Sequence, residues 1–182
     1  MSGTMNPLYY HRYYDVDMVN GPGTRCTLFV SGCAHQCPGC YNQRTWRVDS
    51  GQPFTPALEA RLIADLQDRR IPRQGLSLSG GDPLHPCNVP AILRLVQRVR
   101  RECPGKDIWL WTGYTLAELT LSQRRIVAEL DVLIDGRFIA EQKDPALPWR
   151  GSRNQVIHYL RSRDTCCASR GISADSIIVT AS

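Results

Sequence analysis

Three closely spaced cysteines are the strongest chemical signal in this sequence. Cys33, Cys37 and Cys40 lie within eight residues, in the segment Cys-Ala-His-Gln-Cys-Pro-Gly-Cys. Thiolates bind zinc and iron–sulfur clusters, so three of them in one short loop can surround a single metal centre. The other five of the eight cysteines are dispersed, and we expect packing roles or assign no role to them: Cys26, Cys87, Cys103, Cys166 and Cys167.

The spacing of these cysteines separates three kinds of site. A structural zinc site takes four ligands, usually from two separated pairs, but no second Cys-x-x-Cys pair exists and His35 lies inside the first gap. A thioredoxin-like redox pair needs only Cys37 and Cys40, which leaves Cys33 unexplained. A 4Fe–4S cluster held by three thiolates keeps one iron open for a substrate, much as catalytic zinc keeps an open position. The spacing favours the cluster, with a structural or redox site as the alternative.

A second motif, Ser79-Gly-Gly-Asp-Pro83, has residue types that suit a small charged ligand. Glycines such as Gly80 and Gly81 let a ligand approach the backbone closely, and the Asp82 carboxylate suits an ammonium group. The same residues are also common in an ordinary turn after a strand. Their presence in the same chain as the cysteine loop favours the binding interpretation.

Alternating strands and helices are expected to position these motifs. Predicted strands cover 26–31, 75–79, 107–112, 131–135 and 155–159. Two predicted helices begin at Thr55 and Asn88, and a third covers 116–130. This alternation indicates βαβ units, but a complete eight-fold barrel needs about 250 residues. We therefore expect an α/β fold, a partial, open (βα) barrel with a mostly parallel sheet.

The candidate functional residues all follow predicted strands. The cysteine loop follows the first strand and Gly80–Asp82 the second, while Thr112 ends the third and Asp135 and Arg137 lie at the end of the fourth. Since chemistry in parallel α/β folds gathers at the carboxyl ends of the strands, we expect one common rim.

The two motifs together resemble those of the radical S-adenosylmethionine (SAM) enzymes, with Asp82 where that family often has Glu. The lead-in Val19-Asn-Gly-Pro-Gly-Thr-Arg25 is similar to that of glycyl-radical-enzyme activases. Within that group the chain from about residue 9 to 160 resembles the activating proteins of anaerobic (class III) ribonucleoside-triphosphate reductases. The segments that carry this resemblance are Cys37–Asn42, Leu76–Pro86, Trp111–Tyr114, Asp131–Phe138 and Trp149–Ser152.

The resemblance implies a role for each matching residue. Cys33, Cys37 and Cys40 would ligate a 4Fe–4S cluster with one open iron. The implied SAM-binding residues are Gly39, Cys40 and Tyr41 beside the cluster, Gly80, Gly81 and Asp82 at the methionine end, and Thr112, Asp135 and Arg137 at the other strand ends. Asp135 would bind the ribose hydroxyls and Arg137 the SAM carboxylate. A strand-end salt bridge is the alternative for these last residues.

The resemblance also implies an activity. Reductive cleavage of SAM would give methionine and a 5′-deoxyadenosyl radical, which would take a hydrogen atom from a glycine of the reductase large subunit. The electron would come from a donor such as flavodoxin. No general acid or base is needed, so His11, His35, His85 and His158 are expected to be loop or packing residues. The alternatives are another small radical SAM enzyme, such as a deazaguanine-forming synthase or the pyruvate formate-lyase activase, and a nonenzymatic iron–sulfur or zinc protein.

Composition and charge agree with a globular chain. Hydrophobic residues make up 42% and charged residues 21% of 182 residues, and the net charge of +5 is scattered, so we expect neither nucleic acid nor a membrane as a partner. No apolar run approaches the roughly 18 residues of a membrane span, and the first fourteen residues have no secretory apolar segment. We expect a cytoplasmic protein with one activase domain, 1–160, and a loosely attached extension, 161–182.

Overall fold

One seven-stranded sheet forms the centre of the molecule. The computed structural model describes residues 7–161; most of the predicted extension, from residue 162 onward, lies outside this range. The strand order is β3-β1-β2-β4-β5-β6-β7. The strands are β1 Tyr9–Asp17, β2 Arg25–Val30, β3 Gln52–Pro53, β4 Gly75–Gly80, β5 Asp107–Trp111, β6 Val132–Asp135 and β7 Val156–Tyr159.

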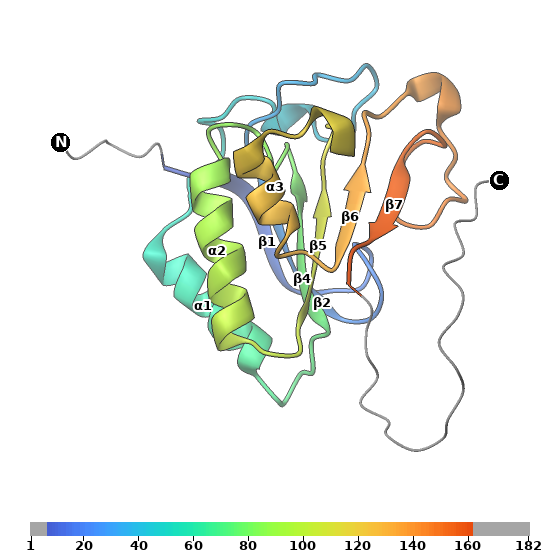
Figure 1. Ribbon diagram of the computed structural model, residues 1–182. Helices are drawn as coiled ribbons and strands as arrows, with labels where there is room; N and C mark the ends of the chain where they lie inside the picture. The colour runs from blue at the N-terminus through green and yellow to red at the C-terminus, as the bar shows by residue number, and fades with distance from the viewer. Residues whose placement is uncertain (1–6, 162–182) are drawn as a thin grey trace, which may run out of the picture.

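The four central strands run parallel. β2 pairs with β4, β4 with β5 and β5 with β6 in parallel, while β1, β3 and β7 join the edges antiparallel. Figure 1 shows the arrows of β4, β5 and β6 pointing to one end of the molecule, with all three α-helices on one face of the sheet. The predicted α/β class and the partial, open barrel with a parallel centre are therefore confirmed.

The helices begin close to where the sequence predicts. They are α1 Pro56–Gln67, α2 Val89–Glu102 and α3 Leu121–Val127, with short 3-10 helices at Gln43–Thr45, Leu116–Glu118 and Ala140–Gln142. The Thr55 side chain accepts from the backbone N–H of Leu58, as expected of an N-cap. Asn88 occupies the N-cap position of α2, but its side chain donates to the carbonyls of Ser31 and Asp82 instead.

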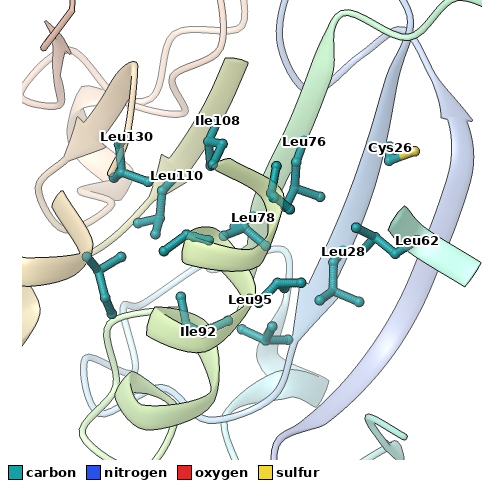
Figure 2. Packing of buried hydrophobic residues seen from close by; sticks show 14 of the residues in the cluster. Cys26, Leu28, Leu62, Leu76, Leu78, Ile92, Leu95, Ile108, Leu110 and Leu130 are labelled. Carbon is teal, nitrogen blue, oxygen red and sulfur yellow. The ribbon is translucent and has the colours of Figure 1, made fainter. Parts of the chain in front are cut away.

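Aliphatic side chains between the sheet and the helices form the main core. Alternate residues of the parallel strands point to this face, since side chains of a strand alternate in direction. Figure 2 shows Leu28, Leu76 and Leu78 from the sheet packed against Leu62 of α1 and Ile92 and Leu95 of α2, all of them fully buried. This packing holds the strands in register, and with them the loops at their carboxyl ends.

Strand β1 was not predicted, because its irregular pairing hides the alternation of buried and exposed side chains. The register between β1 and β2 shifts between Tyr10 and Arg12, so that Tyr10 and Tyr13 both pack against the core although they are three residues apart. A regular strand would place residues an odd number apart on opposite faces. The bulge removes the alternation on which sequence reasoning depends.

The predicted helix over 116–130 is also wrong in its extent. Instead, a 3-10 helix at Leu116–Glu118 precedes α3, and each has its own capping box, begun by Thr115 and Thr120. Two closely spaced Thr-x-x-Glu/Gln motifs are the sequence signal for two starts. No helix within residues 7–161 is both long enough and apolar enough to cross a membrane.

Candidate functional site

The cysteine loop follows β2 and lies at the carboxyl ends of the parallel strands. Its first residues are tied to the segment after the loop, since Gly32 N donates to the Thr45 carbonyl and Cys33 N to the Trp46 carbonyl. The side chains of Cys33, Cys37 and Cys40 are all partly exposed free thiols. All three are thus within reach of a group bound at this rim.

Backbone N–H groups lie near two of the three thiols. Burial raises the pKa of the Cys33 thiol, while backbone N–H groups of His35 and Gln36 oppose that rise by stabilising the thiolate. The Asn42 N–H points to Cys40 Sγ at 3.3 Å, a contact that also favours a thiolate. Among residues 7–161, no three His, Cys, Asp or Glu side chains converge closely enough to hold one metal ion. In a four-iron cluster each thiolate binds a different iron, so the sulfurs can stand farther apart.

Gly80 and Gly81 are required by close contact with the backbone of another segment. A Cβ on Gly81 would lie 2.6 Å from the Gly32 carbonyl oxygen, and one on Gly80 would lie 2.6 Å from backbone atoms of Val30. Gly80 also has a left-handed φ of 106°. The glycines therefore let the end of β4 pack directly against the residue that precedes Cys33.

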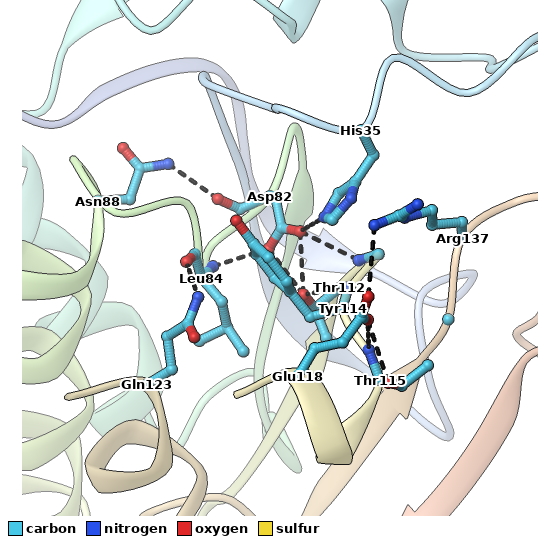
Figure 3. Close-up of polar contacts among 12 residues, drawn as sticks. His35, Asp82, Leu84, Asn88, Thr112, Tyr114, Thr115, Glu118, Gln123 and Arg137 are labelled. Carbon is cyan, nitrogen blue, oxygen red and sulfur yellow. Dashed lines mark hydrogen bonds and ion pairs between the residues drawn. The ribbon is translucent and has the colours of Figure 1, made fainter. Parts of the chain in front are cut away.

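The Asp82 carboxylate is buried and fully engaged by protein donors. It is 1% exposed and accepts from the backbone N–H of Leu84 at 2.8 Å and of Gly113 at 3.0 Å, and from Thr112 Oγ1 at 2.9 Å. His35 Nε2 lies 2.8 Å from its Oδ2 (Figure 3). These contacts join the cysteine loop to the ends of β4 and β5.

His35 is the site residue that sequence reasoning underestimated. It was expected to be a loop or packing residue, but its side chain is 4% exposed and paired with Asp82. This pairing occupies Nε2 of the ring. Its position inside the cysteine motif was the available signal, and no sequence pattern connects residues 47 positions apart.

The other side of the cysteine loop faces the connection between β6 and β7. A Cβ on Gly39 would be 3.5 Å from the Phe138 ring, and the Tyr41 ring centroid is 6.5 Å from that ring. Lys143 Nζ lies 4.9 Å from the Tyr41 ring, an arrangement typical of a cation–π contact. Tyr41 is 76% exposed and, with Cys40, lines an open cavity of about 810 Å³ next to β1.

Asp135 and Arg137 lie together at the end of β6. The Asp135 carboxylate accepts from the Leu116 N–H at 2.9 Å and is 3.1 Å from His158 Nε2. Arg137 is exposed and contacts Glu118 at 3.4 Å. Both residues line an open cavity of about 490 Å³, which Gly113 also borders.

The remaining cysteines lie apart from this rim or outside the description. Cys26 and Cys103 belong to the hydrophobic core, as predicted. Cys87 is partly exposed, and its backbone N–H donates to His85 Nδ1. Cys166 and Cys167 lie outside the described residues.

The comparisons with known proteins agree with this geometry. Residues 19–158 match the model of a 4Fe-4S single cluster domain. The chain is 69% identical over 152 residues to the anaerobic ribonucleoside-triphosphate reductase-activating protein of Escherichia coli K12, covering 84% of this chain and 99% of the relative. It is 68% identical over 149 residues to the protein of that name from Vibrio cholerae, covering 82% and 96%. The counterpart of bacteriophage T4 is 47% identical over 148 residues, covering 81% and 92%.

The three cysteines at the rim of the parallel sheet and the sequence identity to these relatives together identify the family. The 4Fe-4S match over residues 19–158 covers the four parallel strands and every predicted site residue. This chain belongs to the family of anaerobic ribonucleoside-triphosphate reductase-activating proteins and contains their 4Fe-4S single cluster domain.

Proposed function

We propose that this protein reductively cleaves SAM and thereby generates the glycyl radical on the large subunit of an anaerobic ribonucleoside-triphosphate reductase. The observation that carries the proposal is the cysteine loop at the strand ends, in a chain 69% identical to a protein named as the activator of that reductase. When bound at three thiolates, a 4Fe–4S cluster supplies the electron that splits SAM into methionine and a 5′-deoxyadenosyl radical.

Cys33, Cys37 and Cys40 would hold the cluster. Backbone N–H groups that point to Cys33 and Cys40 support their thiolate forms, which are the forms that bind iron. Only these three cysteines lie in the loop, so one iron would stay without a protein ligand. That open position would accept SAM.

The strand ends would bind and orient SAM. Gly80 and Gly81 are partly exposed and pack against the segment that leads into the cysteine loop, and the methionine end of SAM would lie beside them. Because the Asp82 carboxylate already accepts from four donors, we assign it and Thr112 to shaping this pocket. Gly39 and Tyr41 would border the SAM on the cluster side.

Asp135 and Arg137 would complete the binding site at the end of β6. The Arg137 guanidinium is exposed and can turn to pair with the SAM carboxylate. Asp135 is buried and holds the Leu116 backbone, so a contact with the ribose would use its remaining acceptor capacity.

The partner glycine must reach the radical without water entering. The open cavity of about 810 Å³ beside Cys40 is also lined by Tyr14 of β1 and Phe29 of β2. A glycine-bearing segment of the reductase would enter at this cavity.

An electron donor such as flavodoxin and a cytoplasmic location belong to the same proposal. The six described cysteines are free thiols, and thiols persist in a reducing compartment such as the cytoplasm.

The decisive experiment has two stages. Anaerobically reconstituted protein with dithionite and SAM should release 5′-deoxyadenosine, and addition of the reductase large subunit should produce a glycyl radical detected by electron paramagnetic resonance. Cys37→Ala protein is the matched control and should give neither product. Failure of the first stage would favour a nonenzymatic iron–sulfur protein. A radical formed on pyruvate formate-lyase instead would identify a different activase.

A further inference from the structure

The side chain of His35 points into the protein although its backbone belongs to the cysteine loop. Figure 3 shows the ring directed at Asp82 from the segment above the strand ends. Both partners are nearly inaccessible, at 4% and 1% side-chain exposure, and the Nε2–Oδ2 distance is 2.8 Å. Buried polar groups cost free energy unless they are paired, so this contact restricts where the loop can lie.

Asp82 is a rigid acceptor for His35. Leu84 N–H binds Oδ1, Gly113 N–H binds Oδ2, and the Thr112 hydroxyl reaches both oxygens. The carboxylate cannot rotate without breaking several of these hydrogen bonds. His35 therefore meets an oxygen whose position is set by the ends of β4 and β5.

The His35 ring also packs closely against Gly113 and Tyr114, and this position is its seat. A Cβ on Gly113 would lie 2.3 Å from His35 Cδ2, so the absence of a side chain at this position admits the imidazole. On the same ring, Tyr114 packs edge-on with a centroid distance of 4.5 Å and an interplanar angle of 75°. The site is thus shaped by packing as well as by the hydrogen bond.

This contact lies between two candidate ligands. Only three residues separate Cys33 from Cys37, and the backbone turns sharply at Gln36, which has a left-handed φ of 47°. Restraining His35 therefore restrains the thiols on both sides. We infer that His35 is a positioning residue: its contact with Asp82 and its seat on Gly113 hold Cys33 and Cys37 over the strand ends before any cluster is bound.

The same contact would couple two halves of the proposed site. Asp82 directly follows Gly81, whose backbone lies against Gly32, so displacement of the cysteine loop would also disturb the expected methionine end of the SAM pocket. This part of the inference rests on the proposed function. The ordering of the loop does not need SAM, and it can be tested on the protein without a cluster.

The test measures alkylation of individual cysteines in the reduced, iron-free protein. Iodoacetamide modification over time, followed by peptide mass spectrometry, gives separate rates for Cys33 and Cys37. In His35→Ala both rates should rise by up to about tenfold, since the thiols are only partly buried and a hydrogen bond to a charged group restrains local opening by about that order. His35→Gln, whose amide can donate to Asp82, should recover part of the protection.

Gly113→Ala provides a second variant that leaves His35 and every cysteine in place. Its methyl group would push the imidazole off its seat, so the rates at Cys33 and Cys37 should rise as in His35→Ala. His158→Ala is the matched control, because it removes a histidine near a different strand-end carboxylate, Asp135. It should alkylate at wild-type rates.

Cys103 reports on global unfolding within the same samples, since it is buried in the core. Unchanged rates at Cys33 and Cys37 in His35→Ala or Gly113→Ala would overturn the inference. A parallel rise at Cys103 would overturn it as well, because general destabilisation would then explain the result. Wild-type protein that fails to cleave SAM would refute the proposed function without altering these rates.

Discussion

The two ends of the rim formed by the strand ends differ in burial and in hydrogen bonding. The anchored corner, formed by His35, Asp82 and Thr112, is buried and saturated with hydrogen bonds. The open corner, formed by Asp135 and Arg137, contains a buried carboxylate and a guanidinium that is 58% exposed and contacts Glu118 at 3.4 Å. The anchored corner fixes backbone positions, whereas the open corner leaves a charged group available for a ligand.

Iron content should separate the corners most strongly. Cys37→Ala removes one of only three candidate ligands, so the purified and reconstituted protein is expected to lose its cluster completely. Arg137→Ala should keep full iron content, because Arg137 is no ligand. Iron analysis with the visible absorption spectrum tests both. Cys87→Ala is the control cysteine, and loss of iron in that variant would contradict the three-ligand assignment.

The loss of unfolding free energy should differ between variants of the two buried carboxylates, Asp82 and Asp135. Asp82→Ala leaves buried donors of Leu84 and Thr112 without acceptors, which should cost about 3 kcal/mol of unfolding free energy. Asp135→Ala orphans fewer donors and should cost about 1 kcal/mol. Urea denaturation of the iron-free proteins gives both values. Equal losses would mean that the anchored corner is no more structural than the open one.

SAM binding should respond to Arg137 without a change in stability. An exposed ion pair contributes at most about 1 kcal/mol to folding and often nothing measurable, so Arg137→Ala should melt close to the wild-type temperature. If the guanidinium pairs with the SAM carboxylate, the variant should bind SAM about tenfold more weakly, since charge-assisted hydrogen bonds are worth about 1.5–3 kcal/mol. Isothermal titration to the cluster-loaded protein measures this. Arg70→Ala, an exposed cation on the segment between α1 and β4, is the control.

The smallest expected effect is a pH dependence from His85, which lies beside the anchored corner. Burial lowers the pKa of His85 below its ordinary 6.5, which outweighs the opposing attraction of Asp82. The unfolded chain therefore binds this proton more readily, and the stability that His85 contributes is lost as the pH falls below about 6.5. His85→Gln should show a smaller loss of unfolding free energy between about pH 7.5 and 5.5. An identical loss in both proteins would exclude His85 as a cause.

Much of the rim could be predicted because its order along the chain equals its order in space. Each motif follows a strand, and parallel strands linked by helices must end at one edge. The strand ends at Val30, Gly80, Trp111 and Asp135 all lie within about a residue of their predicted positions. The antiparallel edge strands could be predicted less well. The bulge in β1 hides its alternation, and the sequence of β7 does not indicate the direction in which that strand runs.

The sequence by itself determined the kind of chemistry and the elements that carry it. The spacing of Cys33, Cys37 and Cys40 and the Gly-Gly-Asp turn are local patterns, and so is the alternation of helices and strands. Only the tertiary structure decided that Asp82 is saturated by protein donors while Arg137 stays exposed, and that His35 meets Asp82 across a seat on Gly113. The reason is that hydrogen-bond saturation and burial depend on which distant segments meet, and those contacts form only when the sheet packs.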